Sequence, residues 1–329
     1  MTGEKGVLLP ISCLDGFGKD AYKFVDYLVK WRQQYWQVLP ICPRDRYGSP
    51  YDSPASMEID PEYGTKVEWL ALKKYANKNG IKIIGDLSFF VGKGSKECLS
   101  NQDLFLTGQF SGVPQDAYNR RNGQYWGQYQ YNWEKLEQTG FKFFLERFES
   151  AIDLYDLIRL DHFRGYEAVW SIPEGYKSGR KGKWVNVPGE KLFKTAQKKF
   201  GSLPFFAEDL GFITPEVEAL RKEFGFLASR VVQFGNTDEK DIIFYTGTHD
   251  TPTLVGFTGK RRAKKLIEKV LNSNAKIKMI TVPDLLLLDN KARFNRPGSV
   301  KNNWKWKLDI STISPNSPQA SGQWCTFPL

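Results

Sequence analysis

Apolar runs that end in charged side chains recur in this sequence, and they constrain its fold more than any other feature. The clearest is D-L-I-R-L-D-H-F-R-G at Asp156–Gly165, where Leu157, Ile158 and Leu160 lead into Asp161. Two later runs have the same design and end in Glu208 and Asp250: Pro204–Gly211 and Ile242–Asp250. In a parallel α/β barrel the carboxyl ends of the strands carry the chemistry, so these carboxylates are expected to meet at one face.

Along most of the chain, apolar runs alternate with segments whose apolar residues recur at helical spacing. The expected strands are the three above together with Gly6–Pro10, Tyr35–Ile41, Ile81–Phe90, Arg230–Phe234 and Lys276–Val282. The expected helices are Lys19–Gln33, Val67–Asn79, Phe141–Tyr155, Glu190–Phe200, a helix that starts at Thr214–Pro215, and Lys260–Leu271. About eight strands alternating with helices predict an α/β protein with a (β/α)8 TIM barrel. A doubly wound open sheet is the alternative, but no G-x-G-x-x-G follows the first strand to support a dinucleotide site.

The domain organisation follows from the same pattern. Residues 1–310 are expected to form one catalytic barrel domain. Within it, the stretch from Val91 to about Asn132 is rich in Gly, Asn, Gln and Tyr and is predicted to be a long loop that borders the cleft. Residues 311–329 lack periodicity and are expected to form a tail along or beside the surface.

The net charge of +10 raises the possibility of a nucleic-acid partner. The basic residues are scattered, however, and the densest cluster, Lys260–Lys265, lies on an expected helix, where a solvated face explains it better. We therefore predict no nucleic-acid partner. Aromatic residues make up 15% of the chain, which fits either a bulky core or a surface that stacks sugars.

Cysteine usage and hydropathy suggest a reduced compartment. Cys13, Cys42, Cys98 and Cys325 form no C-x-x-C pair and are expected to be structural thiols. The chain begins without a long apolar segment, and no apolar run approaches the ~18 residues of a membrane span. A cytoplasmic protein with no membrane partner is expected.

The catalytic motifs that are absent narrow the chemistry. Two histidines cannot form a multi-histidine zinc site, no G-x-S-x-G marks a serine hydrolase, and no Walker A motif occurs. No cofactor and no metal are expected. Two carboxylates with different pKa values can cleave a glycosidic bond. Arg159 beside Asp161 favours an ionised nucleophile there, and the apolar residues before Glu208 favour a raised pKa and an acid/base role. Charged strand ends without catalysis remain the alternative at this point.

Several motifs resemble those of the 4-α-glucanotransferases (amylomaltases, disproportionating enzymes) of glycoside hydrolase family 77. The strongest are R-L-D-H-F-R-G, A-E-D-L-G-F-I-T-P-E-V and Y-T-G-T-H-D. Others agree in the same order along the chain: G-V-L-L-P-I-S, Y-W-Q-V-L-P, Y-G-S-P-Y-D-S, I-G-D-L-S-F-F-V, S-G-V-P-Q-D, G-Q-Y-W-G and R-F-N-R-P-G followed by N-W-K-W.

The resemblance implies a barrel enzyme that moves α-1,4-glucan segments between maltooligosaccharides with retention of configuration and without a cofactor. It assigns Asp161 as the nucleophile, Glu208 as the acid/base and Asp250 as the carboxylate that stabilises the transition state. It also implies that four residues bind or border the substrate: Arg159, His249, Tyr51 and Trp126. We add Asp86 to this substrate-binding set because it lies towards the end of its strand. His162 is expected to give structural support.

The sequence is shorter than is usual in that family. Compared with that family, segments are expected to be missing after Gly64, where the family carries an inserted helical subdomain, and after Asp250. Tyr129 stands where a proline is usual. Three functions therefore stay open: a glucanotransferase, a glucan hydrolase in which water is the acceptor, or a glucan-binding protein without turnover. The oligomeric state is not predicted.

Overall fold

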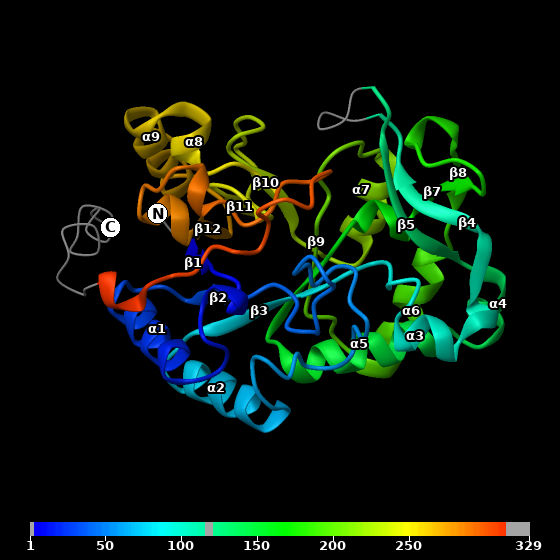
Figure 1. The fold of residues 1–329 in the computed structure, drawn as a ribbon, viewed down its shortest axis with the longest axis horizontal. Coiled ribbons are helices and arrows are strands. Elements are labelled where there is room, and N and C mark those ends of the chain that lie inside the picture. The colour runs from blue at the N-terminus through cyan, green and yellow to red at the C-terminus, as the bar shows by residue number, and fades with distance from the viewer. Residues whose placement is uncertain (1–2, 116–120, 314–329) are drawn as a thin grey trace.

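Eight parallel strands form one sheet in the computed structural model, which describes residues 3–115 and 121–313 (Figure 1). In order across the sheet they are β10 (Ala228–Val231), β11 (Ile242–Tyr245), β12 (Ile277–Thr281), β1 (Glu4–Leu8), β2 (Tyr35–Gln37), β3 (Lys82–Leu87), β6 (Leu157–Leu160) and β9 (Phe205–Ala207). All eight expected strands are present, most of them shorter than their apolar runs.

The two edges of this sheet, β9 and β10, meet and close it into a barrel. A single parallel bridge joins Phe206 to Leu227, and the Ala207 N–H donates to the Leu227 carbonyl at 2.9 Å. Side chains extend this short seam. The Ser229 hydroxyl donates to the Ala207 carbonyl at 2.7 Å, and the Ser229 N–H donates to Asp209 Oδ1 at 2.8 Å. The barrel prediction is confirmed, and the open sheet is excluded because its edges are joined.

The barrel strands are three to six residues long, and the barrel that they form has a packed interior. Nearly every residue in β2, β3, β9, β11 and β12 is buried, as expected for parallel strands covered on both faces. Gly6 of β1 shows how tight the packing is. A Cβ atom there would lie 2.8 Å from both the Tyr35 Cβ and the Met279 Cε, so the neighbouring strands leave room only for glycine.

Helices cover the outside of the barrel, and Figure 1 shows α1, α2 and α5 on the outer side of the strands. The helices that follow barrel strands are α1 (Lys19–Lys30), α2 (Lys66–Lys78), α5 (Lys142–Leu154), α6 (Gly189–Phe200), α7 (Pro215–Glu223), α8 (Leu254–Thr258), α9 (Lys260–Leu271) and α10 (Val282–Leu285). Local signals set their starts. Thr65 and Glu68 form a reciprocal capping box at α2, and Pro215 occupies the first turn of α7.

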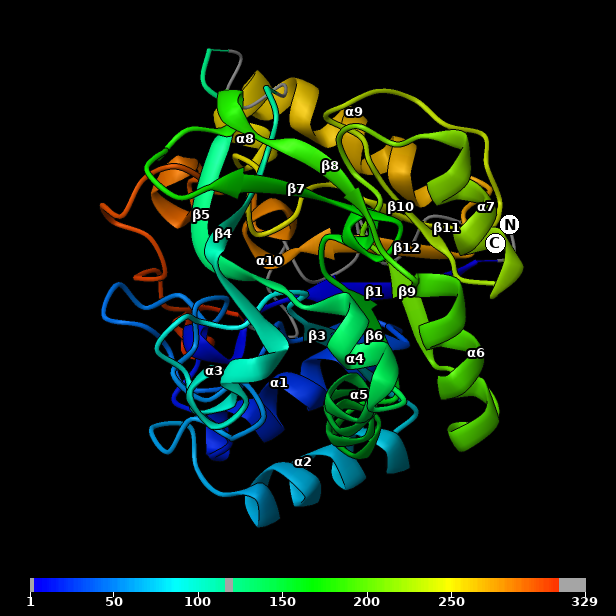
Figure 2. The ribbon, with the colours of Figure 1, turned by 90° about the vertical axis from the view of Figure 1, so that its right-hand side faces the viewer.

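A second sheet, antiparallel and four-stranded, lies beside the barrel. Its order is β5 (Gln124–Tyr131), β4 (Phe105–Val113), β7 (Ala168–Pro173) and β8 (Lys183–Asn186). Figure 2 faces this sheet and shows its strands in front of the barrel strands. Short helices α3 (Lys96–Ser100) and α4 (Trp133–Gln138) flank its first two strands.

The prediction of a long loop from Val91 to Asn132 is therefore wrong, since α3, β4 and β5 lie within it. Register shifts between Leu106 and Gly112 break the alternation of apolar and polar residues that would identify a strand. The stretch does border the cleft, as described below. The boundary at residue 310 stays a prediction, because residues 314–329 lie outside the described part of the chain.

The hydrophobic core runs through the barrel and under its helices. Phe144, Phe148 and Phe193 are fully buried there, and truncation of such a side chain to alanine costs about 3–5 kcal/mol. Cys13, Cys42 and Cys98 are buried free thiols, whereas Cys325 lies outside the described residues. In residues 3–115 and 121–313, no helix is long and apolar enough to cross a membrane.

Candidate active site

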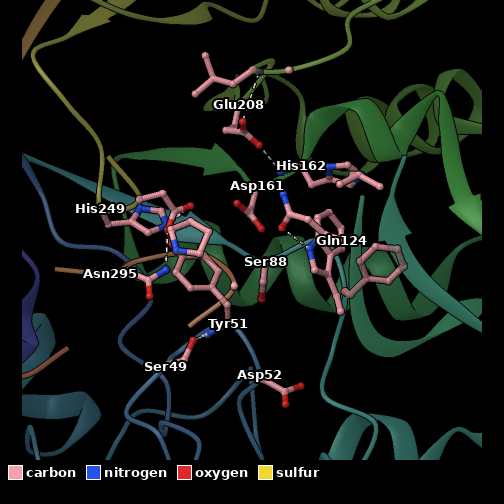
Figure 3. A pocket seen from close by; sticks show the side chains of 18 of the residues that line it. Ser49, Tyr51, Asp52, Ser88, Gln124, Asp161, His162, Glu208, His249 and Asn295 are labelled. Atoms are coloured by element: carbon pink, nitrogen blue, oxygen red, sulfur yellow. Dashed lines mark hydrogen bonds and ion pairs between the residues drawn. The ribbon is translucent and has the colours of Figure 1, made fainter. Parts of the chain in front are cut away.

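A cleft of about 540 Å³ opens at the carboxyl ends of the barrel strands. Asp161 follows β6, Glu208 follows β9 and Asp250 follows β11, and all three line this cleft, as their positions after parallel strands predicted. In Figure 3, Asp161 lies between Glu208 on one side and the Tyr51–His249 pair on the other. The cleft is therefore the candidate active site.

Arg159 connects the carboxylates at the floor of the cleft. Its Nη1 lies 2.7 Å from Asp161 Oδ1 and 2.8 Å from Asp86 Oδ2, and its Nη2 lies 3.8 Å from Glu208 Oε2. Burial opposes the charge of this guanidinium, but Asp86 and then Asp161 outweigh it and raise the pKa of Arg159 well above its usual value. One fixed positive charge is thus shared among three acidic groups.

Asp86 does not line the cleft, although we included it among the substrate-binding residues. Its side chain is 0% exposed, with both oxygens on Arg159 Nη1, and it accepts a hydrogen bond from the Tyr51 hydroxyl at 3.0 Å. Burial raises the pKa of Asp86, and Arg159 opposes that shift. Asp86 lies on β3, which pairs directly with β6 and places Asp86 opposite Arg159. From there it orients Arg159 and Tyr51.

Arg164, three residues after Asp161, takes no part in the carboxylate cluster. It forms an ion pair with Glu167, three residues along the chain. Its guanidinium carbon lies 4.1 Å from the centre of the Trp184 ring, in a cation–π contact. Both Arg164 and Trp184 line the cleft beyond the carboxylates.

Glu208 is held by backbone donors. The His162 N–H donates to Oε2 at 2.8 Å, and the Leu210 N–H donates to Oε1 at 3.3 Å. Burial raises the pKa of Glu208 from 4.5 to about 8, the negative charge of Asp161 adds to the rise, and Arg159 with the backbone donor opposes it. The raised pKa expected from sequence is confirmed, and it leaves this carboxyl protonated at neutral pH.

Asp250 has the opposite environment. Asn295 Nδ2 donates to Oδ1 at 2.6 Å, His249 Nε2 lies 3.3 Å from Oδ2, and Arg293 Nη2 donates to the Asp250 carbonyl at 2.5 Å. Burial would raise the pKa of Asp250, but the charge and hydrogen bond of His249 and the Asn295 amide outweigh it and lower the pKa to about 2. The sequence contained Asn295 and Arg293 in the R-F-N-R-P-G motif without indicating that this segment returns to Asp250.

Three aromatic rings gather beside Asp250. The rings of Tyr51 and His249 are stacked, with centres 4.9 Å apart and planes 15° apart. Trp304 lies 5.8 Å from His249 and 6.1 Å from Tyr51. Tyr51 and His249 were predicted for this region, whereas Trp304 was not, although it belongs to the N-W-K-W motif.

Trp126, which lies on β5, also lines the cleft. Its ring meets the His162 ring edge-on at 4.9 Å, and its Nε1 donates to Gln124 at 3.1 Å. His162 has a left-handed backbone (φ 48°), which turns its N–H towards Glu208. Burial lowers the pKa of the His162 imidazole to about 4, so its ring is neutral where it lines the cleft beside Trp126. The supporting role expected for His162 stays a prediction.

The site therefore combines a protonated carboxyl at Glu208, a carboxylate at Asp161 that is paired with Arg159, and an ionised Asp250 beside stacked rings. Among the described residues, no three His, Cys, Asp or Glu side chains gather in a way that would hold a metal ion. Such an arrangement suits acid–base and nucleophilic chemistry at a sugar carbon.

Comparison with known proteins points in the same direction. The model of a family described as 4-alpha-glucanotransferase matches residues 14–68 and 62–312. The two matched stretches overlap next to Gly64, where the sequence predicts a missing segment. A 4-alpha-glucanotransferase of Thermus thermophilus is 38% identical over 291 residues, which cover 75% of this chain and 58% of the relative. One of Aquifex aeolicus is 38% identical over 277 residues, covering 73% and 57%. The chain thus spans less than two thirds of the length of these relatives.

Solved structures share the fold. The amylomaltase from Streptococcus agalactiae in complex with acarbose superposes with a TM-score of 0.87 at 23% identity, covering 96% of this chain and 97% of that one. The amylomaltase from Corynebacterium glutamicum gives a TM-score of 0.78 at 13% identity, covering 92% and 71%.

Proposed function

Because this chain belongs to the 4-alpha-glucanotransferase family, glycoside hydrolase family 77, we propose that it transfers α-1,4-glucan segments between maltooligosaccharides. The observation that carries the proposal is the pair formed by Asp161 and Glu208. The first is ion-paired with Arg159, and the second has a pKa of about 8. A retaining transfer needs this combination of one carboxylate and one carboxylic acid.

In the first step, an Asp161 oxygen forms a bond to the anomeric carbon of the donor while the glycosidic C–O bond breaks. The Glu208 proton goes to the departing oxygen. In the second step, a hydroxyl oxygen of the acceptor attacks the same carbon, its proton passes to Glu208, and the bond to Asp161 breaks. Two inversions give net retention. We expect the two carboxyl groups to lie about 5–5.5 Å apart, the spacing of retaining enzymes.

The remaining residues bind the donor sugar and its transition state. The ionised Asp250 faces the positive charge that develops on the sugar ring, where a fixed negative charge lowers the barrier. Arg159 and His249 offer donors to sugar hydroxyls, and the Tyr51 ring offers a flat apolar surface. Trp126 borders the same cleft. No cofactor takes part.

Hydrolysis is the second candidate. The side chains of Asp161 and Asp250 keep 25% and 38% of their surface exposed, so water reaches the glycosyl-enzyme unless a sugar displaces it.

Incubation with maltotriose tests the proposal. Transfer gives glucose together with a ladder of longer maltodextrins, whereas hydrolysis gives only shorter products. Asp161→Asn keeps the shape of the side chain and should reduce turnover by orders of magnitude without unfolding the protein. If Asp161→Asn and Glu208→Gln both convert maltotriose at the wild-type rate, the chemistry lies elsewhere.

A further inference from the structure

Phe212 is exposed beside two apolar residues that are partly buried, Leu210 and Ile213. Leu210 and Ile213 pack against the hydrophobic core, whereas the Phe212 side chain lines the cleft and is 66% exposed. A single exposed apolar residue needs no explanation elsewhere on a protein surface. Here the exposed ring stands within a candidate active site, where it can meet a ligand.

The loop that carries Phe212 is fixed to the candidate acid/base. Glu208 lies four residues earlier, and the Leu210 N–H donates to its Oε1 at 3.3 Å. Gly211 has φ +93°, a left-handed conformation that glycine adopts without strain, and it turns the chain between the partly buried Leu210 and the exposed Phe212. The position of Phe212 is therefore coupled to that of Glu208.

A second aromatic ring, Trp184, lines the same cleft. One face of Trp184 is covered by the Arg164 guanidinium, which fixes the ring. The turn Phe163–Tyr166, which carries Arg164, contacts α7, the helix that follows the loop of Phe212. The Arg164–Trp184 pair and Phe212 thus line one cleft from neighbouring segments.

The geometry of the reaction identifies which sugar this region would meet. Figure 3 places Glu208 and the Tyr51–His249 pair on opposite sides of Asp161. An acid must reach the oxygen of the leaving group, so the leaving group, and later the acceptor, lies on the side of Glu208. Phe212 lines the cleft from the loop that directly follows Glu208 and is hydrogen-bonded to it.

We propose that Phe212, facing the same cleft as Trp184, stacks on the acceptor sugar and favours it over water in the second step. This inference rests on the proposed function. The face of a glucose ring that carries C–H groups is apolar, and an aromatic ring that covers it gains contact area without having to order a flexible side chain. Such stacking concentrates an acceptor beside the glycosyl-enzyme.

The test uses α-maltosyl fluoride as the donor and glucose as the acceptor. Asp161 displaces fluoride, whose departure needs no proton from the enzyme, and the maltosyl-enzyme then divides between glucose and water. The measured quantity is the ratio of maltotriose to maltose at a fixed glucose concentration. This ratio does not depend on how much of a variant is folded. Phe212→Ala should lower it roughly tenfold, which corresponds to about 1.4 kcal/mol, and Phe212→Tyr should preserve it.

Phe257→Ala is the matched control, because Phe257 is 50% exposed on α8 and does not line the cleft. If the ratio for Phe212→Ala equals that of Phe257→Ala, or if Phe212→Tyr falls as far as Phe212→Ala, the stacking role is refuted while the transferase function stands. If the wild type releases fluoride no faster than Asp161→Asn, the proposed function itself fails.

Discussion

Glu208 and Asp250 occupy equivalent positions at the mouth of the barrel, yet their protonation states are opposite. Each follows a parallel strand, and each lines the same cleft. Glu208 has a pKa of about 8 and Asp250 a pKa of about 2. Burial raises the pKa of both, so burial does not explain the difference.

The donors around each carboxyl explain it. Glu208 receives hydrogen bonds from two backbone N–H groups, and its nearest guanidinium nitrogen, Arg159 Nη2, is 3.8 Å away. The other terminal nitrogen of the same guanidinium, Nη1, pairs with Asp161. Asp250 receives a 2.6 Å hydrogen bond from Asn295 and the charge of His249. The comparison teaches that the side chains around each carboxyl, here the adjacent His249 and the more distant Asn295, decide which carboxyl keeps its proton.

The two sides also differ in how their strands are held. β11, before Asp250, has four paired positions with β10 and three with β12. β9, before Glu208, has three with β6 but only one bridge towards β10, supplemented by Ser229 and Asp209. The acid/base candidate therefore stands at the seam of the barrel.

Removing the proton of Glu208 should have the largest effect. Glu208→Gln is expected to lower kcat/KM for maltotriose by about 10³-fold, within the range of general acid–base catalysis. In the wild type, kcat/KM should fall about tenfold per pH unit above about 8, as the acid is lost. A pH profile that stays flat to pH 10 would contradict the assignment.

The same substitution should change the pH dependence of stability. The folded-state pKa of Glu208 lies above its value in an unfolded chain, so its stability contribution is present below pH 4.5 and is lost as pH rises to about 8. Because glutamine cannot ionise, Glu208→Gln should lose less stability than the wild type between pH 5 and 8. Thermal melts at both pH values measure this difference.

Asp86→Asn should come next, because it leaves Arg159 without its closest buried partner. We expect a loss of about 3 kcal/mol in the free energy of unfolding and a fall in kcat of roughly 30- to 100-fold per folded molecule, since Arg159 and Tyr51 lose their orientation. Asp60→Asn is the control. Asp60 pairs with Arg44 outside the cleft, so its loss should lower stability without changing kcat.

Asn295→Ala should make the environment of Asp250 more like that of Glu208. Loss of the amide donor should raise the pKa of Asp250 from about 2 and reduce kcat/KM roughly tenfold, as expected for a hydrogen bond to a charged group. The low folded-state pKa contributes stability above pH 3.8 that is lost as pH falls towards 2, and the variant should lack part of it. Asn77→Ala, which removes a hydrogen bond to Asp156 away from the cleft, should leave kcat/KM for maltotriose at the wild-type value.

Ser229→Ala tests the seam and should have the smallest effect. It removes the hydroxyl that donates to Ala207, at a cost of about 1 kcal/mol in the free energy of unfolding. The ordinary backbone bridge remains, so kcat should change less than threefold. A Tm equal to that of the wild type would show that the seam does not depend on this side chain.

The sequence predicted the barrel well because its strands and helices carry strong local signals. The helix Lys260–Leu271 begins and ends where the pattern placed it, and β11 begins at Ile242, the start of its apolar run. The meeting of Asp161, Glu208 and Asp250 also followed, since parallel strands bring their carboxyl ends to one face. The raised pKa of Glu208 was predicted for the right reason, burial.

Long-range contacts account for what the sequence did not predict. The strands β4 and β5 are half-exposed and interrupted by register shifts, so their alternation is weak. The burial of Asp86 depends on how β3 pairs with β6. Asn295 and Trp304 reach the cleft on a segment that returns to the barrel mouth. This segment has motifs but no helical or strand periodicity from which its path could be predicted. Whether residue 310 ends the domain stays a prediction.

The pairing of β1 with β12 has a consequence for folding. Glu4–Leu8 pairs in register with Ile277–Thr281, and the Tyr245 hydroxyl donates to Gln37 across 208 residues of sequence. The barrel cannot close until its last strand has been synthesised, and such non-local closure slows folding because loop entropy is lost before the contacts form. Until then, the free edge of β1 is open to pairing with other chains, so slow refolding with concentration-dependent aggregation is the expected behaviour.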